Sequence, residues 1–244
     1  MDVLTLHFPP RSQWPGWEHP TLALAAYGDA LQHEAHARPL STRPHDKNAL
    51  PAELVVVSTL GGSDYASDSP IFLASAKDDP SREYVLKMAL RDDLVSGLAA
   101  EYIAYSRHLQ SLQGGLVPIC YGLFVSDQPA RADEPPLIGA LVLSYVGTPP
   151  PVAFPQLPDL VRRQILLALQ ELHDAGVVHR DLAERNIVLE PLRPDGTVSG
   201  PDDFKVHIID FDAIETGHEC PGLEGDPPCE QLTEVVEMFG LGGR

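Results

Sequence analysis

The chain has 244 residues, with 35 acidic and 17 basic side chains, so its formal net charge is −18. A surface this negative repels the phosphates of nucleic acids and anionic lipid headgroups, so we expect neither as a partner. The sequence has no run of 18 apolar residues, which argues against a transmembrane helix. The N-terminus lacks the pattern of a secretory signal, and three cysteines make no disulfide framework, so we expect a cytoplasmic or nuclear protein.

The first 50 residues are rich in proline and are interpreted as an extension. Within them only residues 21–35 are expected to form an ordered element, a short helix. The composition then changes, because β-branched and apolar runs bounded by turn residues predict strands. Five strands are expected at 53–60, 71–76, 82–90, 116–126 and 137–146. Apolar residues at helical spacing predict a helix over 90–112, between the third and fourth strands.

The second half begins with a strongly amphipathic stretch that predicts a helix over 155–176. Short strands are expected on both sides of a polar loop at 177–190, and a buried strand at 204–215. A Pro/Gly-rich insert at 191–203 separates them, and 232–240 predicts a closing helix. The order of elements indicates an α+β protein. We expect three parts, at 1–50, 51–147 and 148–244.

Two of the three cysteines, Cys220 and Cys229, lie close together in a predicted loop. They are consistent with a redox pair, with half of a metal site, or with two ordinary loop thiols. Eight residues separate them, which matches no common zinc spacing. The sequence alone therefore favours loop thiols.

Several polar residues stand where predicted strands end or where apolar residues surround them. Asp181, Asn186 and Asp210 lie at the ends of predicted strands. Lys87 lies inside an apolar strand, where an ammonium group is costly to bury unless it is paired. Glu101, in the helix that follows, is the expected partner of Lys87.

Read together, four segments resemble the protein-kinase family. HRDLAERN at 179–186 is similar to the catalytic loop H-R-D-L-x-x-x-N, and DFD at 210–212 is similar to the D-F-G metal motif. VLK at 85–87 is similar to the end of V-A-I-K, and LSYVG at 143–147 is similar to the hinge segment. The chain most resembles a minimal, atypical, fungal kinase-like member, because only 34 residues follow Asp210.

The resemblance implies a two-lobed protein-kinase-like fold. Its first lobe would be a five-stranded antiparallel sheet with one helix, and its second a shortened helical lobe. The implied activity is transfer of the γ-phosphate of Mg·ATP to a hydroxyl, with a protein as the favoured acceptor. The implied cofactors are ATP and Mg²⁺. A small-molecule kinase on the same fold and a non-catalytic nucleotide-binding scaffold remain as alternatives.

The resemblance also assigns roles to residues of the second half. Asp181 would accept or orient the acceptor hydroxyl, and Arg185 would bring positive charge to the γ-phosphate. Asn186 and Asp210 would hold Mg²⁺, which prefers oxygen ligands.

In the first half, Lys87 would bind the α- and β-phosphates and Glu101 would steady it. Gly61 and Gly62 would form a weak version of the glycine-rich loop over the phosphates. Further contacts with the nucleotide are implied for Leu143, Tyr145, Val146 and Val188.

The remaining motif residues separate the alternatives. His179 and Phe211 would be packing residues without a chemical role. Asp212 replaces the last glycine of D-F-G, which favours a small-molecule kinase. Arg180 in H-R-D disfavours that alternative.

Overall fold

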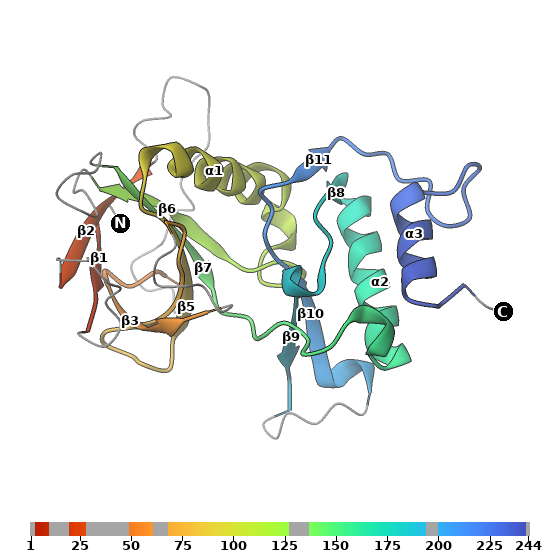
Figure 1. Ribbon diagram of the computed structural model, residues 1–244, viewed down its shortest axis with the longest axis horizontal. Helices are drawn as coiled ribbons and strands as arrows, with labels where there is room; N and C mark the ends of the chain where they lie inside the picture. The colour runs from red at the N-terminus through yellow and green to blue at the C-terminus, as the bar shows by residue number, and fades with distance from the viewer. Residues whose placement is uncertain are drawn as a thin grey trace. The chain divides into compact units, whose positions relative to one another are not determined.

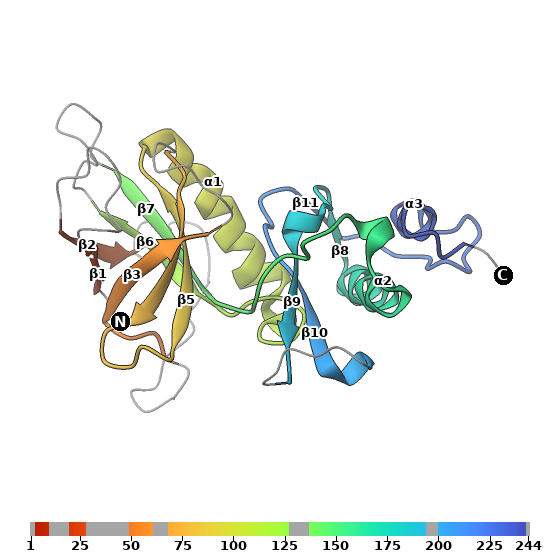
Figure 2. The ribbon, with the colours of Figure 1, turned by 60° about the horizontal axis from the view of Figure 1, so that its bottom comes forward.

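A computed structural model of the protein describes residues 3–9, 20–27, 49–60, 68–126, 137–193 and 200–242. The chain forms two compact units, drawn in Figures 1 and 2. The first unit consists of residues 1–107 and 119–145, and the second of residues 108–118 and 146–244. Among the helices of the described residues, none has both the length and the apolar character that crossing a membrane requires.

The first unit is built around a closed barrel of seven strands. The strands are β1 (Val3–His7), β2 (Thr21–Ala26), β3 (Glu53–Thr59), β4 (Ile71–Ala76), β5 (Glu83–Ala89), β6 (Cys120–Ser126) and β7 (Ile138–Ser144). Their order around the barrel is β1-β2-β6-β7-β5-β4-β3. The barrel closes where β1 pairs with β3 in parallel, and the other neighbouring strands pair antiparallel.

Every second side chain of a strand points into the barrel and fills its interior, because successive side chains point to opposite faces. In β1, Leu4 and Leu6 are fully buried, and the intervening Thr5 is only half-buried. In β5, Leu86 and Met88 belong to the same core, and Lys87 between them points to the outer face. The other strands add further apolar residues to this core, among them Leu22, Leu24, Leu54, Phe72, Ala140 and Val142.

One helix, α1 (Asp92–Ile103), covers part of the outer face of the barrel. It approaches β7 so closely that a Cβ atom on Gly139 would lie 3.2 Å from a methyl carbon of Val95. All residues of β7 from Ile138 to Leu143 are buried, because the core covers one face and α1 the other. A π-helical turn (Ala104–His108) and a 3-10 turn (Gln110–Leu112) follow the helix.

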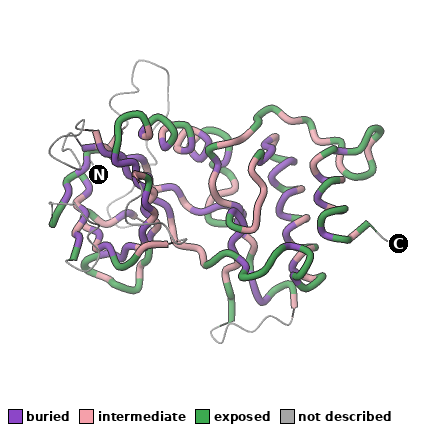
Figure 3. Tube along the Cα trace, in the orientation of Figure 1, coloured by how far each residue is buried: buried purple, intermediate pink, exposed green. Residues whose placement is uncertain are grey.

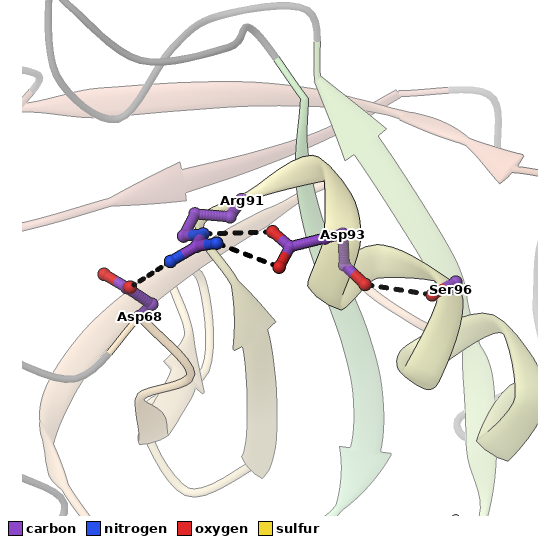
Figure 4. A network of polar contacts seen from close by, with 4 residues as sticks. All are labelled: Asp68, Arg91, Asp93 and Ser96. Carbon is purple, nitrogen blue, oxygen red and sulfur yellow. Dashed lines mark hydrogen bonds and ion pairs between the residues drawn. The ribbon is translucent and has the colours of Figure 1, made fainter.

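The N-terminus of α1 is held by a polar network (Figure 4). The Arg91 guanidinium donates from Nε (3.0 Å) and Nη2 (2.9 Å) to the two carboxylate oxygens of Asp93, in the first turn. It also donates through Nη1 to Asp68, at 3.3 Å. Within the first turn, the Ser96 hydroxyl donates to the Asp93 backbone carbonyl at 3.0 Å. The network therefore ties the helix to the segment before β4 and places a cation beside Asp68.

The second unit contains two more helices and two pairs of strands. Its elements are α2 (Asp159–Asp174), β8 (Val177–His179), β9 (Ile187–Pro191), β10 (Phe204–Ile208), β11 (Ile214–Thr216) and α3 (Glu230–Met238). Strands β8 and β11 pair antiparallel, as do β9 and β10. Helix α2 buries one stripe, visible as the alternation of colours along it in Figure 3. The ring of Phe154, before α2, packs against Phe239, after α3, with centroids 5.1 Å apart.

The expected two-lobed protein-kinase-like fold is wrong. The five predicted strands lie close to β3–β7, and the helices predicted over 90–112, 155–176 and 232–240 lie close to α1–α3, but their assembly differs from that layout. Instead of a five-stranded antiparallel sheet, the described residues form a closed seven-stranded barrel of mixed pairing, with three α-helices in the whole described chain. The assignment to a minimal kinase-like family, and the description as an atypical kinase, are withdrawn with that fold.

The two additional strands lie in the region expected to be an extension. Thr21–Ala26 is the strand β2 and not part of a helix over 21–35. Two of the prolines, Pro9 and Pro20, stand just outside β1 and β2, where a missing N–H costs no ladder hydrogen bond, so their presence does not exclude strands. Pro20 even contributes a bond, since its carbonyl accepts the N–H of Phe8 at 2.9 Å.

Candidate functional site

Three predicted site residues lie near one end of the β9–β10 hairpin in the second unit. Ile187 of β9 is paired with Ile208 of β10, so the residues before β9 and after β10 lie at the same end. The N–H of Ile209 donates to the carbonyl of Asn186 at 3.0 Å, which extends the ladder by one bond. Asn186 and Asp210 are thereby brought to the same hairpin end.

Asp181 is joined to Asn186 and Arg185 by direct hydrogen bonds. The Asn186 amide nitrogen donates to the backbone carbonyl of Asp181 at 2.8 Å and to its Oδ2 at 3.1 Å. The Arg185 guanidinium donates to the same Oδ2 at 2.5 Å. Asn186 is buried, whereas the carboxylate of Asp181 is 43% exposed. Because the Asn186 nitrogen faces Asp181, the oxygen of the same amide is directed elsewhere.

Charge around Asp181 favours its ionised form. The hydrogen bond and the positive charge of Arg185 lower the pKa of the Asp181 carboxyl below its usual value, and Asn186 contributes in the same direction. Asp181 is therefore an anion at neutral pH. It is suited to accept a hydrogen bond from a hydroxyl and is a weak proton acceptor.

Two buried rings lie beside the loop that carries Asp181. His179 and Phe211 are both buried and meet edge to face, with ring centroids 5.3 Å apart. His179 Nδ1 accepts the backbone N–H of Asp181 at 3.2 Å, so Nε2 carries the proton and donates to the carbonyl of Ile209 at 3.0 Å. The two rings pack against each other, and the histidine links the segments that carry Asp181 and Asp210.

The backbone of Asp210 adopts a left-handed conformation, with φ of 70°. Among the described residues it is the one non-glycine residue with positive φ. Such backbone costs free energy outside glycine, although aspartate and asparagine tolerate it better than most residues, and it collects at functional sites. The left-handed backbone therefore makes Asp210 a candidate functional residue.

The second predicted pair lies in the first unit, on the face of the barrel that α1 covers. Lys87 of β5 and Glu101 of α1 form an ion pair, with Nζ and Oε2 2.5 Å apart. The glutamate side chain is 1% exposed and the lysine side chain 18% exposed. The prediction that these two residues pair is confirmed. Because both are well shielded from water, their attraction is screened far less than that of a surface pair.

The residues predicted to contact the nucleotide are distributed over both units. Leu143 lies buried in β7, and Tyr145 follows it, where partial burial raises the pKa of its phenol. Val146 is the next residue, in the second unit, and Val188 is buried in β9. Gly61 and Gly62 lie outside the described residues.

Sequence reasoning did not single out Glu184, which holds the polar loop in place. Its Oε1 accepts the backbone N–H of Phe154 at 2.9 Å, so the turn Glu184–Asn186 is fixed to the segment before α2. A glutamate beside an exposed arginine gives no sequence signal for this role, because the partner is a backbone group thirty residues away.

Comparison with known proteins adds no family to this picture. No model of a known protein family matches the chain, and a search of curated proteins finds no match. The functional argument therefore depends on the geometry of the described residues.

Proposed function

We propose that the protein transfers the terminal phosphoryl group of Mg·ATP to a hydroxyl acceptor. The observation that carries this proposal is the arrangement around Asp181. An ionised carboxylate bonded to Asn186 and Arg185 lies in a loop that His179 links to the segment carrying the left-handed Asp210. Phosphoryl transfer asks a protein mainly for positioning and charge, and this arrangement offers both.

The donor set suits magnesium. Asn186 and Asp210 would hold the ion through an amide oxygen and a carboxylate, the ligand types that Mg²⁺ prefers, and the bound ion would neutralise phosphate charge. The amide nitrogen of Asn186 is bonded to Asp181, so the amide oxygen would be the atom that binds the ion. The left-handed backbone of Asp210 supports its assignment independently, because such conformations are common at functional sites.

Asp181 and Arg185 would act on the reacting groups. The lowered pKa of Asp181 keeps it ionised, so it accepts a hydrogen bond from the acceptor hydroxyl and orients it. Arg185 is 65% exposed and is held near the carboxylate by their ion pair, which places a fixed positive charge where phosphate oxygens would gain from it. The roles predicted for Lys87, Glu101, Gly61, Gly62 and the nucleotide-contacting residues stay predictions.

The test begins with calorimetric titration of ATP into the full chain, with and without Mg²⁺. Mg²⁺-dependent binding is expected, and Asp210→Asn should weaken it because a charged metal ligand is lost. Asp202→Asn is the matched control, since Asp202 is an exposed aspartate beyond the other end of β10. No binding at millimolar ATP, or equal binding by both variants, would refute the assignment.

Turnover is then measured with protein acceptors and with small alcohols. Asp181→Asn should retain ATP affinity and lose roughly 10²-fold in kcat, the usual effect of misplacing a reacting group. Transfer to small alcohols alone would identify a metabolite acceptor. Magnesium-dependent binding without transfer to any acceptor would contradict catalysis and identify a nucleotide-binding scaffold.

A further inference from the structure

Four potential metal ligands, none of which belongs to the arrangement around Asp181, converge in the second unit. They are His173 in the last turn of α2, His218 and Cys220 in the segment after β11, and Cys229 at the start of α3. Their ligand atoms all lie within 4.8 Å of one another. We propose that these four side chains bind a structural zinc ion.

Three sulfur–nitrogen distances among the ligand atoms match those of a tetrahedral site. The Sγ atoms of Cys220 and Cys229 each lie 3.5 Å from Nδ1 of His173, and Sγ of Cys229 lies 3.7 Å from Nε2 of His218. Zinc bonds of about 2.3 Å to sulfur and about 2.05 Å to nitrogen, at tetrahedral angles, require sulfur–nitrogen distances of about 3.6 Å. The observed separations leave the space that one zinc ion occupies.

A neighbouring amide orients the most buried ligand. His173 Nε2 donates to Oε1 of Gln231 at 2.7 Å, and the amide nitrogen of Gln231 donates to the carbonyl of His179 at 2.7 Å. With its proton on Nε2, the His173 ring directs the lone pair of Nδ1 at the two sulfurs. Metal-binding histidines ordinarily have such a partner on the second nitrogen, which fixes both tautomer and ring angle.

The backbone after Cys220 adds a donor to its sulfur. The N–H of Gly222 points to the Cys220 Sγ atom at 3.4 Å. Gly222 adopts φ of 70°, a conformation that glycine reaches at little cost. A backbone N–H aimed at sulfur stabilises a thiolate more than a thiol, and the thiolate is the form that binds zinc.

The alternatives explain less of this arrangement. Neither cysteine is in a disulfide, and a redox pair would give no reason for two imidazoles to face the same point. Two thiolates and two imidazoles in a tetrahedron are the donor set of zinc, whereas magnesium and calcium require oxygen. Four protein ligands leave no open position, so the ion would be structural and not catalytic. It would join α2, the segment between β11 and α3, and α3 itself.

The zinc content of the full-length protein tests this proposal directly. Protein purified without chelator and dialysed against metal-free buffer should retain about one zinc ion per chain, measured by mass spectrometry. Cys220→Ser and His218→Gln should lose it. Cys120→Ala is the matched control and should keep it, because Cys120 is a buried cysteine of β6 in the other unit. Gln231→Ala should bind zinc roughly 10–100-fold more weakly, the usual effect of removing an orienting group.

Cobalt provides a readout that does not depend on whether a variant folds. The wild-type chain, stripped of metal and titrated with Co²⁺, should show the intense visible bands of tetrahedral cobalt and a sulfur-to-cobalt charge-transfer band. An octahedral spectrum, or folded wild-type protein that retains no metal after exposure to zinc, would overturn the proposal. A Cys220–Cys229 disulfide in the purified protein would also overturn it. None of these outcomes bears on ATP binding, so this inference and the proposed function fail independently.

Discussion

Replacing Leu6 with alanine should destabilise the barrel, because the Leu6 side chain is fully buried in its core. Leu6 lies opposite Leu22 of β2 and Leu54 of β3, at the place where the barrel closes. Removing three carbon groups costs about 2 kcal/mol of transfer free energy, and the cavity left between three strands adds to this. We therefore expect the free energy of unfolding of the first unit to fall by about 2–5 kcal/mol.

Hydrogen exchange read by mass spectrometry is the suitable assay, since it reports the two units separately and does not assume that they unfold together. Peptides of β1, β3 and β7 should exchange faster in Leu6→Ala, and those of α2 should not. Val3→Ala is the control, because Val3 lies in the same strand and is 52% exposed, so we expect a change of at most about 0.5 kcal/mol. If the two variants behaved alike, β1 would not be part of the core and the closed barrel would be refuted.

Three further predictions concern titratable groups. Lys87→Met should lower the free energy of unfolding by roughly 3–5 kcal/mol in urea denaturation, because buried Glu101 loses the ammonium group 2.5 Å away; a loss no larger than that of exposed Lys77→Met would contradict this. Burial lowers the pKa of His207 below its usual value of 6.5, although the hydrogen bond to Glu190 opposes the shift. The unfolded chain therefore binds this proton more tightly than the folded chain, and the free energy of unfolding decreases as the pH falls below 6.5. His207→Gln should flatten that acid limb of a stability–pH curve, and an unchanged slope would count against it. Burial raises the pKa of the Cys120 thiol to about 12, so alkylation of the native protein at pH 8 should spare Cys120 until denaturant is added.

The sequence predicted local elements far better than their assembly. The apolar run of β4 and the amphipathic stripe of α2 each bury enough surface to determine their own conformation, and both were located within a few residues. Alternation along a strand shows which face is buried but not which strand lies beside it. Nothing in the sequence therefore indicated that β1 pairs with β3, or that β2 pairs with β6.

For the polar residues too, the sequence predicts what depends on local pattern. Asp181, Asn186 and Asp210 are predicted as site residues because each stands at the end of a predicted strand, and the structure joins the first two by a hydrogen bond. The pairing of Lys87 with Glu101 is predicted because a lysine in an apolar strand needs a counterion, and it is confirmed. These inferences require only local pattern and elementary electrostatics.

The proposed zinc ligands were half found. The sequence places Cys220 and Cys229 close together, but their spacing matches no common zinc motif, and it gives no pattern that adds His173 and His218 to them. His173 offers one signal, because it lies on the buried stripe of α2 and a buried imidazole needs a polar partner. The ligands come from two helices and the segment between β11 and α3, so their proximity is a property of the fold and not of the sequence.

The order of strands in the barrel has a consequence for synthesis on the ribosome. Before β6 and β7 emerge, strands β1–β5 can form an open sheet in the order β2-β1-β3-β4-β5, with β2 and β5 as exposed edges. Residues of β2 and β6 that pair, such as Ala25 and Val125, are one hundred positions apart, so that bond waits for most of the nascent barrel. The β6–β7 hairpin covers both edges at once when it inserts between them. The nascent chain is therefore most exposed to chaperones and to edge-to-edge aggregation just before β7, which ends at Ser144, emerges from the ribosome.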